Sequence, residues 1–347
     1  MTRGIILGKF APLTLGHIAC IARAASRVDE LCVVLCWDEK FQQTVPSELA
    51  NILTLGNRHR WLLETYARYP SIRVRVVDES KIKSYPEGAA DFTKLVRAQL
   101  QDEYGEDTVT HTFSSEPEYD GYFNEHFKEA EHQVIDADRA LVAISATRVR
   151  ADVYANWDYL APAARKDFVK RVVVIGCEST GKTTLVRQLT DYFATTTVPE
   201  VGRVICEDEF FSHEEYMTSE DYEDVAYRHK TAEAMALRNA RKVLISDTNN
   251  LITEFSARLM GHESQVLAEL SRREQYDLVL YLDIDVPWVG DNLRRNGDAN
   301  RRKQTDTLLR RMCEERSVQN IVHIGGSYEA RFLQAIAEIT RLLGGQT

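Results

Sequence analysis

Residues 176–183 carry two glycines, a lysine and a threonine at the spacing G-x-x-x-x-G-K-[ST], and they follow a run of apolar residues at 172–175. Glycines at these places let the backbone curl until its N–H groups face a polyphosphate. The Lys182 ammonium would offer a charge to the β- and γ-phosphates, and the Thr183 hydroxyl would be a ligand of Mg²⁺. The motif therefore predicts a P-loop that binds ATP. Its expected contacts are Gly176, Glu178, Ser179, Thr180, Gly181, Lys182, Thr183 and Thr184.

Two carboxylates in the same half of the chain could serve a phosphoryl transfer. The apolar run 243–246 ends in Asp247, the place of a Walker-B-type aspartate that holds Mg²⁺. Glu200 follows the first helix after the P-loop and a short threonine-rich strand. There it could take the proton of an acceptor hydroxyl, which a small-molecule kinase requires. The alternative is that Glu200 is an exposed loop residue without a catalytic role.

A basic stretch lies between residues 294 and 303, around Asn296-Gly297-Asp298. Arginines in a polar loop that closes over the transferring phosphoryl group would form a LID, because charge builds up on its oxygens. A solvated helix face or a nucleic-acid patch are the alternatives. The expected phosphate contacts are Arg294, Arg301 and Arg302. The expected acceptor contacts in this half are Arg203, Trp288 and Asp291, although Trp288 could equally belong to the core.

The first half of the chain holds a different phosphate loop, at residues 8–17. Pro12 and Gly16 shape this loop at a helix N-terminus, where free N–H groups and the helix dipole favour phosphate. His17 could donate a hydrogen bond to an α-phosphate oxygen. The loop resembles the G-x-F-x-P-x-[HT]-x-G-H signature of the nucleotidyltransferase superfamily, and residues 144–150 resemble its I-S-x-T-x-x-R motif. The ATP contacts that this resemblance implies are Gly8, Lys9, Phe10, Thr14, Gly16, His17, Ser145, Thr147 and Arg150.

Strands alternate with helices throughout the chain, which predicts βαβ units and parallel sheets. In the first half we expect strands near 4–7, 31–35, 72–76, 109–113 and 133–135, and helices near 16–27, 58–69 and 92–104. The pattern stops around 153–171 and restarts with strands at 172–175, 243–246, 278–282 and 321–324. We therefore predict two α/β domains with parallel sheets. Residues 1–167 would form a Rossmann-like nucleotidyltransferase, and residues 168–347 a kinase of the P-loop NTPase type.

Composition and charge narrow the class of protein. The 347 residues contain 43 Lys and Arg against 53 Asp and Glu, a net charge of −10, which argues against a nucleic-acid binder. No apolar run approaches the length of a membrane span, and the apolar stretch near the N-terminus is too short for a signal peptide. The six cysteines show no paired metal-ligand spacing. We expect a cytoplasmic protein with reduced thiols and no membrane partner.

A nucleotidyltransferase followed by a P-loop kinase resembles the NadR family, bifunctional nicotinamide-mononucleotide (NMN) adenylyltransferases and ribosylnicotinamide kinases. The resemblance covers essentially the whole chain. It includes Gly8-Lys9-Phe10, Arg58-His59-Arg60-Trp61-Leu62, Ser84-Tyr85-Pro86, Ser115-Glu116-Pro117, residues 145–150, Pro162, Arg165, residues 176–183, Pro287-Trp288-Val289, Asp291 and Leu293-Arg294. Some relatives carry an N-terminal helix-turn-helix domain. Because the first expected strand begins at Gly4, we expect the form without that domain.

The resemblance implies two reactions that use ATP and Mg²⁺. Ribosylnicotinamide would be phosphorylated to NMN, and NMN would then be adenylylated to NAD with release of pyrophosphate. The expected partners are these small molecules, ATP, NMN, ribosylnicotinamide and NAD, without nucleic acid; a homo-oligomer is left open.

Two departures from the family pattern concern the first half. Thr14 replaces a histidine that many adenylyltransferases have, and no tryptophan follows Tyr85-Pro86 near 89–92. Trp37 and Trp61 are therefore the candidates for contact with nicotinamide, or else they belong to the core. Two other functions stay open: a transferase for another phosphate acceptor fused to a different nucleoside kinase, and a sensor that binds ATP and NAD without turnover.

Overall fold

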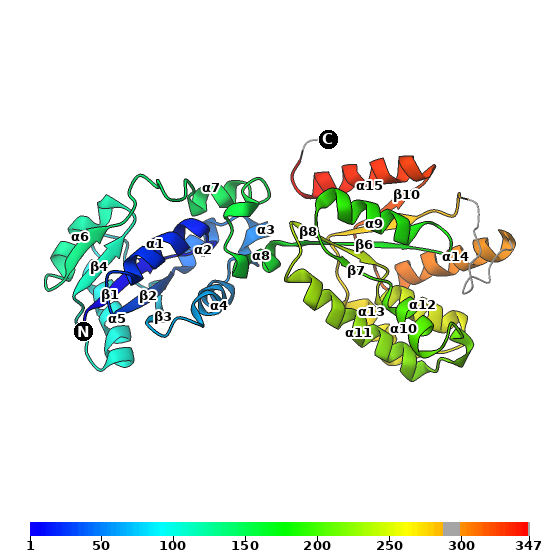
Figure 1. Ribbon diagram of the computed structural model, residues 1–347, viewed down its shortest axis with the longest axis horizontal. Helices are drawn as coiled ribbons and strands as arrows, with labels where there is room; N and C mark the ends of the chain where they lie inside the picture. Colours follow the sequence, from blue (N-terminus) through cyan, green and yellow to red (C-terminus); the bar gives the residue numbers. More distant parts are fainter. Residues whose placement is uncertain (287–298, 346–347) are drawn as a thin grey trace. The chain divides into compact units, whose positions relative to one another are not determined.

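The computed structural model describes residues 1–286 and 299–345. By its internal contacts the chain divides into two compact units, Met1–Phe168 and Val169–Thr347. Each unit is built on one five-stranded parallel sheet with helices around it (Figure 1). The predicted class, two α/β domains with parallel sheets, is confirmed.

The sheet of the first unit has the strand order β3-β2-β1-β4-β5. Its strands are β1 (Arg3–Gly8), β2 (Glu30–Trp37), β3 (Ile72–Asp78), β4 (His111–Ser114) and β5 (Glu131–Val134). Its helices are α1 (Leu15–Ala25), α2 (Glu39–Thr44), α3 (Ser47–Ala50), α4 (Leu55–Tyr66), α5 (Ala89–Tyr104), α6 (Asp120–His126), α7 (Ala146–Ala151) and α8 (Pro162–Phe168), with 3₁₀ turns η1 (Pro117–Tyr119) and η2 (Trp157–Tyr159). The strand order changes direction at β1, and ligands of open α/β sheets bind at the carboxyl ends of the strands at such a point.

The sheet of the second unit has the order β10-β9-β6-β8-β7. Its strands are β6 (Lys170–Gly176), β7 (Thr197–Val198), β8 (Val243–Asp247), β9 (Leu278–Leu282) and β10 (Ile321–Ile324). Its helices are α9 (Lys182–Phe193), α10 (Val201–Glu209), α11 (Ser219–Leu237), α12 (Asn250–Leu259), α13 (Gln265–Arg273), α14 (Ala299–Glu315) and α15 (Tyr328–Leu342), with the 3₁₀ turn η3 (Glu214–Tyr216). The central strand β6 carries the P-loop at its carboxyl end.

Alternate side chains of β6 enter two hydrophobic cores, as the two-residue period of a strand requires. Val172 and Val174 pack with residues of α9 and α15, including Leu189. Val173 and Ile175 pack with residues of α12 and α14 on the other face. Because both faces are covered, the strand is apolar without interruption, which is typical of a parallel sheet.

Several element boundaries differ from the sequence prediction. The helix expected near 58–69 is α4, Leu55–Tyr66, because the Thr54 side chain caps it by accepting a hydrogen bond from the Asn57 amide. The helix expected at 92–104 begins at Ala89. The connector 153–171 contains η2 and α8 as well as the start of β6. The short helices α2, α3 and α6 were not predicted, since segments of four to seven residues show too little periodicity to be recognised.

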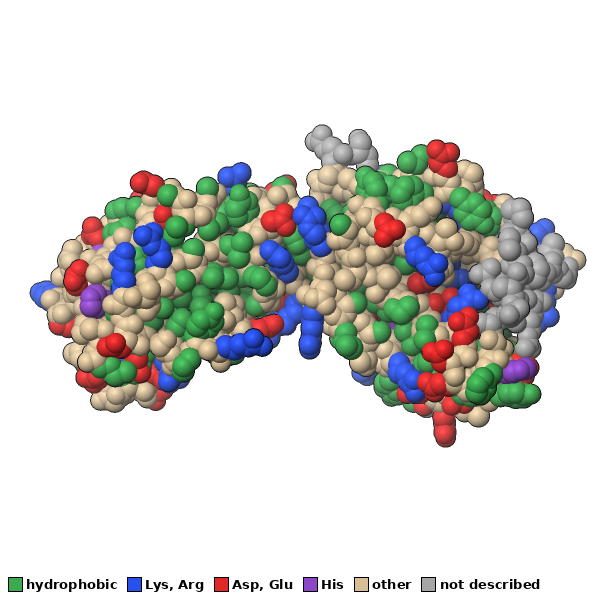
Figure 2. Space-filling view, in the orientation of Figure 1, with side chains coloured by type: hydrophobic (Ala, Val, Ile, Leu, Met, Phe, Trp, Pro, Cys, Tyr) green, Lys and Arg blue, Asp and Glu red, His purple; other side chains and the backbone are tan. Residues whose placement is uncertain are grey.

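On the face of the molecule drawn in Figure 2, the described lysine and arginine side chains are interspersed with acidic ones. Among the described residues no helix combines the length and apolar character that a membrane crossing requires.

Candidate functional sites

The P-loop follows β6 and leads directly into α9. Gly176 has φ 143° and Gly181 has φ 86°, conformations that side chains rarely adopt. A Cβ atom on Gly176 would also lie 2.8 Å from the Leu282 carbonyl oxygen, and one on Gly181 would lie 2.8 Å from the Tyr328 ring. Lys182 Nζ donates to the carbonyl oxygens of Gly176 and Cys177, at 3.1 Å each. The positive φ values and the close contacts therefore require both glycines of the motif, and the lysine lies across the loop.

All the P-loop residues predicted to contact ATP line one cavity of about 170 Å³, which we call the kinase cavity. Glu200, just before α10, and Arg203 on α10 line the same cavity. Arg203 donates to Glu207 at 3.0 Å. The cavity thus brings the predicted acceptor residues Glu200 and Arg203 together with the predicted phosphate loop.

Asp247 ends β8 beside the P-loop and is 2% exposed. Burial and the neighbouring charge of Glu200 raise the pKa of Asp247 to about 6, against the opposing effects of a Thr183 hydrogen bond and of Lys182. Its Oδ1 atom has no hydrogen-bond partner among the described residues. A buried carboxylate oxygen of this kind next to a threonine hydroxyl is a suitable pair of hard ligands for Mg²⁺.

Part of the kinase-cavity lining, outside the P-loop, is apolar and aromatic. Its lining includes Cys206, Met217, Tyr222, Val225, Ile252 and Phe255. Tyr222, which is 2% exposed, donates its hydroxyl hydrogen to Glu214 Oε1 at 3.0 Å, and Glu214 lines the cavity as well. Sequence reasoning missed this pair, because Glu214 and Tyr222 belong to no motif and converge only when η3 packs against α11.

The predicted LID residues have a mixed outcome. Arg294, Trp288 and Asp291 lie outside the described residues. Arg301 and Arg302, expected in a polar loop, lie instead in helix α14, because the sequence from Ala299 onward continues as a regular helix. Arg301 is exposed.

Arg302 is only 8% exposed, and its Nη1 atom donates to the Val286 carbonyl oxygen at 2.8 Å. Its Nε and Nη2 atoms have no partner among the described residues. Neither Arg301 nor Arg302 is part of the kinase-cavity lining, whereas Thr305 of the same helix is. The assignment of Arg301 and Arg302 as phosphate contacts therefore stays a prediction.

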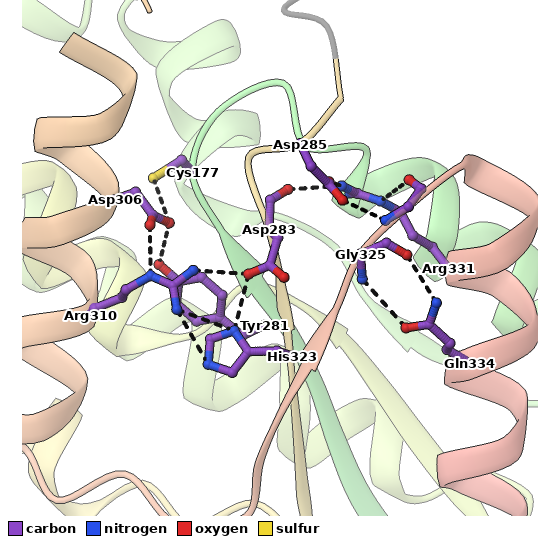
Figure 3. Close-up of polar contacts among 11 residues, drawn as sticks. Cys177, Tyr281, Asp283, Asp285, Asp306, Arg310, His323, Gly325, Arg331 and Gln334 are labelled. Atoms are coloured by element: carbon purple, nitrogen blue, oxygen red, sulfur yellow. Dashed lines mark hydrogen bonds and ion pairs between the residues drawn. The ribbon is translucent and has the colours of Figure 1, made fainter. Parts of the chain in front are cut away.

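Helix α14 is fastened next to the P-loop by a polar network at the carboxyl ends of β9 and β10 (Figure 3). Asp306 accepts hydrogen bonds from the Tyr281 hydroxyl at 2.8 Å and from Arg310 Nε at 2.6 Å. Arg310 Nη2 also donates to Asp283 at 2.9 Å, and its guanidinium lies 4.7 Å from the centre of the Tyr281 ring. His323 lies 3.1 Å from the same Asp283 oxygen.

In the first unit, all the predicted ATP contacts from both motifs line a single cavity of about 380 Å³, the transferase cavity. The loop after β1 supplies one side, and the start of α7 supplies the other. Arg150 of α7 donates to the Ala11 carbonyl oxygen and, at 3.0 Å, to the Thr147 hydroxyl. The tertiary fold thus joins two motifs that stand at opposite ends of the unit's sequence.

His17 is held in one tautomer by the start of α1. Thr14 is the N-cap residue, and its hydroxyl accepts a hydrogen bond from the His17 amide at 3.3 Å. The Thr14 amide donates to His17 Nδ1 at 3.1 Å. Because a backbone amide can only donate, Nδ1 is the acceptor and the proton of the neutral ring sits on Nε2. Burial, together with Arg139 and Arg150, lowers the pKa of His17 to about 4, so the ring is neutral at pH 7.

Thr14 itself is 1% exposed, and its hydroxyl is engaged in the helix cap. Phe10 packs edge-on against the His17 ring, with 5.1 Å between centroids. Lys9 pairs with Asp38 at 3.3 Å at the edge of the cavity. Among the expected ATP contacts, Thr14 and Phe10 therefore hold the His17 ring in place, Thr14 by hydrogen bonds and Phe10 by packing.

Sequence reasoning missed several residues of the transferase cavity. Arg139 lines it and lies 3.4 Å from Glu116, with both side chains partly exposed. Asp136 accepts hydrogen bonds from the amides of Ala140 and Leu141 and so shapes the loop that carries Arg139. The only sequence signal for Asp136 and Arg139 as cavity residues was that they lie shortly before the I-S-x-T-x-x-R motif.

The two tryptophan candidates do not line either cavity. Trp61 is fully buried, its indole N–H donates to Asp167 at 2.6 Å, and its ring packs on Phe168. Of the two alternatives stated for Trp61, the structure supports a place in the core. Trp37 is half-buried, and its ring stacks with the Arg58 guanidinium at 4.5 Å.

Comparison with known proteins agrees with this arrangement. Residues 171–331 match the family model described as an AAA domain. The chain is 31% identical over 352 residues to the trifunctional NAD biosynthesis/regulator protein NadR of Escherichia coli (strain K12), covering 99% of this chain and 84% of that protein. The NadR protein of Salmonella typhimurium (strain LT2) is also 31% identical, with the same coverage.

Two solved structures share the fold over 100% of this chain and 97% of their own chains. A NadR protein in complex with NR superimposes with a TM-score of 0.80 at 23% identity. A NadR protein in complex with NAD and AMP-PNP gives 0.77 at 24% identity. The extent and level of identity to the curated relatives show that this chain belongs to the NadR family of NAD biosynthesis proteins.

Proposed function

We propose that the two cavities carry two consecutive transferase reactions of NAD biosynthesis. In the kinase cavity, the γ-phosphoryl group of ATP passes to the ribose 5′-hydroxyl of ribosylnicotinamide, which gives NMN. In the transferase cavity, the NMN phosphate attacks the α-phosphorus of a second ATP, which gives NAD and pyrophosphate. The observation that carries the proposal is that each unit assembles its own complete phosphate loop in its own cavity.

The first unit would accordingly be a Rossmann-like nucleotidyltransferase domain. Its parallel sheet changes strand order at β1, and the transferase cavity is lined by the loop that follows this strand. The ligands named for the solved NadR structures, NR in one and NAD with AMP-PNP in the other, support a nucleoside, a dinucleotide and ATP as ligands here.

In the kinase cavity, the P-loop amides and Lys182 would bind the phosphates, and Glu200 lines the same cavity, where it could meet an acceptor hydroxyl. A hydroxyl is a poor nucleophile until its proton is accepted, which gives the carboxylate of Glu200 a function as base or orienting group. Thr183 and Asp247 would hold Mg²⁺, which when bound spreads the negative charge of the phosphates. Their oxygen atoms fit this ion, as the unpartnered Oδ1 of Asp247 indicates.

In the transferase cavity, His17 donates from Nε2 to the α-phosphate oxygen as negative charge develops there. Ser145, Thr147 and Arg150 at the start of α7 bind the β- and γ-phosphates that leave as pyrophosphate. The nucleophile is the phosphate of NMN, which is already an anion. Neither step requires a covalent intermediate, since positioning and charge stabilisation are sufficient.

The acceptor end of the kinase cavity suits ribosylnicotinamide through its charge. The pyridinium ring of this nucleoside is cationic, unlike the bases of ordinary nucleosides. An aromatic face and a carboxylate attract such a ring. Tyr222 and Glu214, held together by their hydrogen bond, offer both.

The test is incubation of the protein with ribosylnicotinamide, ATP and Mg²⁺, followed by chromatography for NMN and NAD. Formation of both supports the proposal. Activity with another nucleoside in preference to ribosylnicotinamide would favour the alternative pair of enzymes. Tight binding of ATP and NAD without any product would favour a sensor.

A cytoplasmic location is part of the proposal, supported by the six free cysteines and by the requirement for ATP. The absence of a nucleic-acid partner stays a prediction, and a homo-oligomer stays an open possibility.

A further inference from the structure

Arg331, on α15 behind the P-loop, is 2% exposed, and its whole guanidinium is engaged (Figure 3). Nη1 donates to the carbonyl oxygen of Thr180 at 2.7 Å, Nη2 to that of Asp283 at 2.8 Å, and Nε to that of Gly326 at 3.0 Å. The carboxylate of Asp285 pairs with the same guanidinium. A buried charge that is paired and fully hydrogen-bonded in this way has one fixed position.

The bond to Thr180 has a consequence for the next amide. In a planar trans peptide, the carbonyl oxygen of one residue and the N–H of the following residue point in opposite directions. Arg331 holds the Thr180 carbonyl, so the N–H of Gly181 points away from Arg331. Thr180 and Gly181 both line the kinase cavity, and α9 begins at the next residue.

The same peptide is confined from a second side by α15. Gly181 has φ 86°, and a Cβ atom placed on it would lie 2.8 Å from the ring of Tyr328, the first residue of α15. The loop backbone is therefore packed closely against Tyr328 and hydrogen-bonded to Arg331. Backbone N–H groups at the start of such a helix are the groups that bind phosphate.

We propose that Arg331 is a positioning residue for the kinase reaction. It fixes the Thr180–Gly181 peptide so that the Gly181 N–H faces the polyphosphate, and it acts through the loop without contacting ATP. This inference rests on the proposed use of the P-loop as the ATP site. It assigns to α15, which contains no phosphate motif, a part in the affinity for ATP.

Helix α15 supplies a matched control. Gln334 is exposed, lies one turn after Arg331, and bonds the backbone of Gly325 through Nε2 to the carbonyl oxygen at 2.9 Å. It thus supports the loop before α15 but bonds no P-loop residue in the described part of the chain. Asp285, whose side chain is 44% exposed, supplies a milder way to disturb Arg331.

The experiment is calorimetric titration of the full-length protein with Mg²⁺–ADP and, separately, with ribosylnicotinamide. The variants are Arg331→Gln, Arg331→Lys, Asp285→Asn and Gln334→Ala. We expect Arg331→Gln to raise the Kd for ADP about 10-fold or more, because a hydrogen bond to a charged group is lost and a buried carbonyl is left unpaired. Asp285→Asn should shift it in the same direction by less, and Gln334→Ala should leave it unchanged.

A positioning role predicts that the Kd for ribosylnicotinamide stays within about 2-fold in every variant, and that NAD formation from supplied NMN is unaffected. Equal weakening of both ligands would show that Arg331 only supports the fold, and an unchanged Kd for ADP in a folded Arg331 variant would overturn the inference outright. Should Arg331→Gln fail to fold, Arg331→Lys and Asp285→Asn decide by the same two criteria. If the wild-type protein binds ADP but not ribosylnicotinamide, the proposed function fails while the ADP comparison still tests Arg331.

Discussion

The two cavities differ in the acid–base character of their central side chains. Glu200 lines the kinase cavity and Asp247 is buried beside the P-loop, and burial together with the charge of Glu200 raises the pKa of Asp247 to about 6. In the transferase cavity the central group is a histidine whose pKa is lowered to about 4, by burial and by two arginines. In the proposed reactions, the kinase cavity would accept a proton and the transferase cavity would keep a neutral donor.

The nucleophiles of the two proposed reactions account for this difference. A ribose hydroxyl has a proton to lose, so a carboxylate beside it is useful. The phosphate of NMN is already ionised, so a base would add only repulsion. Two carboxylates that line the transferase cavity have partners within the protein. Asp136 accepts hydrogen bonds from backbone amides, and Glu116 pairs with Arg139. On the proposed reactions, a carboxylate base is therefore needed in the kinase cavity and not in the transferase cavity.

The largest expected effect separates the two cavities. Lys182→Ala removes the charge that neutralises the β- and γ-phosphates, so it should abolish NMN formation from ribosylnicotinamide. NAD formation from supplied NMN should stay nearly intact. Both rates can be followed by chromatography of the same preparation. Loss of both activities in a folded variant would be incompatible with two independent sites.

Glu200→Gln keeps the shape of the side chain and removes its charge. It should lower kcat of the kinase by about 10²–10⁴ while ATP still binds, because a general base is lost. Glu209→Gln, at the end of α10, is the matched control and should be nearly silent, because Glu209 pairs with Arg228 and neither side chain lines the kinase cavity. Asp247→Asn should instead weaken the dependence on Mg²⁺. If Glu200→Gln is silent and Asp247→Asn is inactive at every Mg²⁺ concentration, the role of base passes to Asp247.

His17→Ala should reduce adenylyl transfer by about 10²–10³, the usual effect of losing one donor to a developing phosphate charge. NMN should then accumulate when the variant receives ribosylnicotinamide and ATP. Thr14→Val, which removes only the capping hydroxyl, is the control for damage to the start of α1. Equal rates of NAD formation in the wild type and in His17→Ala would show that His17 only supports the start of α1 and takes no part in catalysis.

Glu214→Gln tests the charge at the acceptor end of the kinase cavity. Ribosylnicotinamide and its reduced dihydro form have nearly the same shape, but only the first has a cationic ring. The variant should lower the ratio of their kcat/KM values roughly 10-fold, as loss of one partly screened charge interaction implies. Glu215→Gln, whose side chain pairs with His213 at 3.1 Å, should leave the ratio unchanged. An unaltered ratio in Glu214→Gln would remove Glu214 from substrate selection.

The smallest effect is a shift in pH dependence. Because Asp247 has a pKa of about 6, above its ordinary 3.8, the folded state binds a proton that competes with Mg²⁺ as pH falls below about 6. Kinase activity at limiting Mg²⁺ should therefore fall in that range, and Glu200→Gln should move the fall to lower pH. The transferase should show no such fall from His17, which stays neutral down to about pH 4. Coincident pH profiles for both reactions would contradict the contrast between the cavities.

The same shifts have opposite consequences for stability. The raised pKa of Asp247 means that its contribution to the free energy of unfolding falls as pH rises from 3.8 to about 6. The lowered pKa of His17 means that its contribution rises as pH increases from about 4 to 6.5. Substituting either residue should remove the corresponding slope from denaturation measured across this range.

The sequence by itself determined the features whose causes are local. The P-loop was predictable because two glycines, a lysine and a threonine between a strand and a helix have few other uses. Strand β9 was predicted with the bounds that it has, since a buried parallel strand is apolar over its whole length, and β10 was predicted with its bounds as well although it contains the exposed His323. The two phosphate loops, and with them the family resemblance, followed from such local signals.

Only the tertiary structure decided which side chains meet. Trp61 could have faced a ligand or the core, and the position of Asp167 and Phe168 placed it in the core. Glu214 meets Tyr222 because η3 packs against the helix that follows it, and Arg331 meets Thr180 through packing between elements distant in sequence. The physical reason is that a motif encodes the conformation of its own backbone, whereas the burial, pKa and partners of a side chain depend on neighbours that the fold supplies.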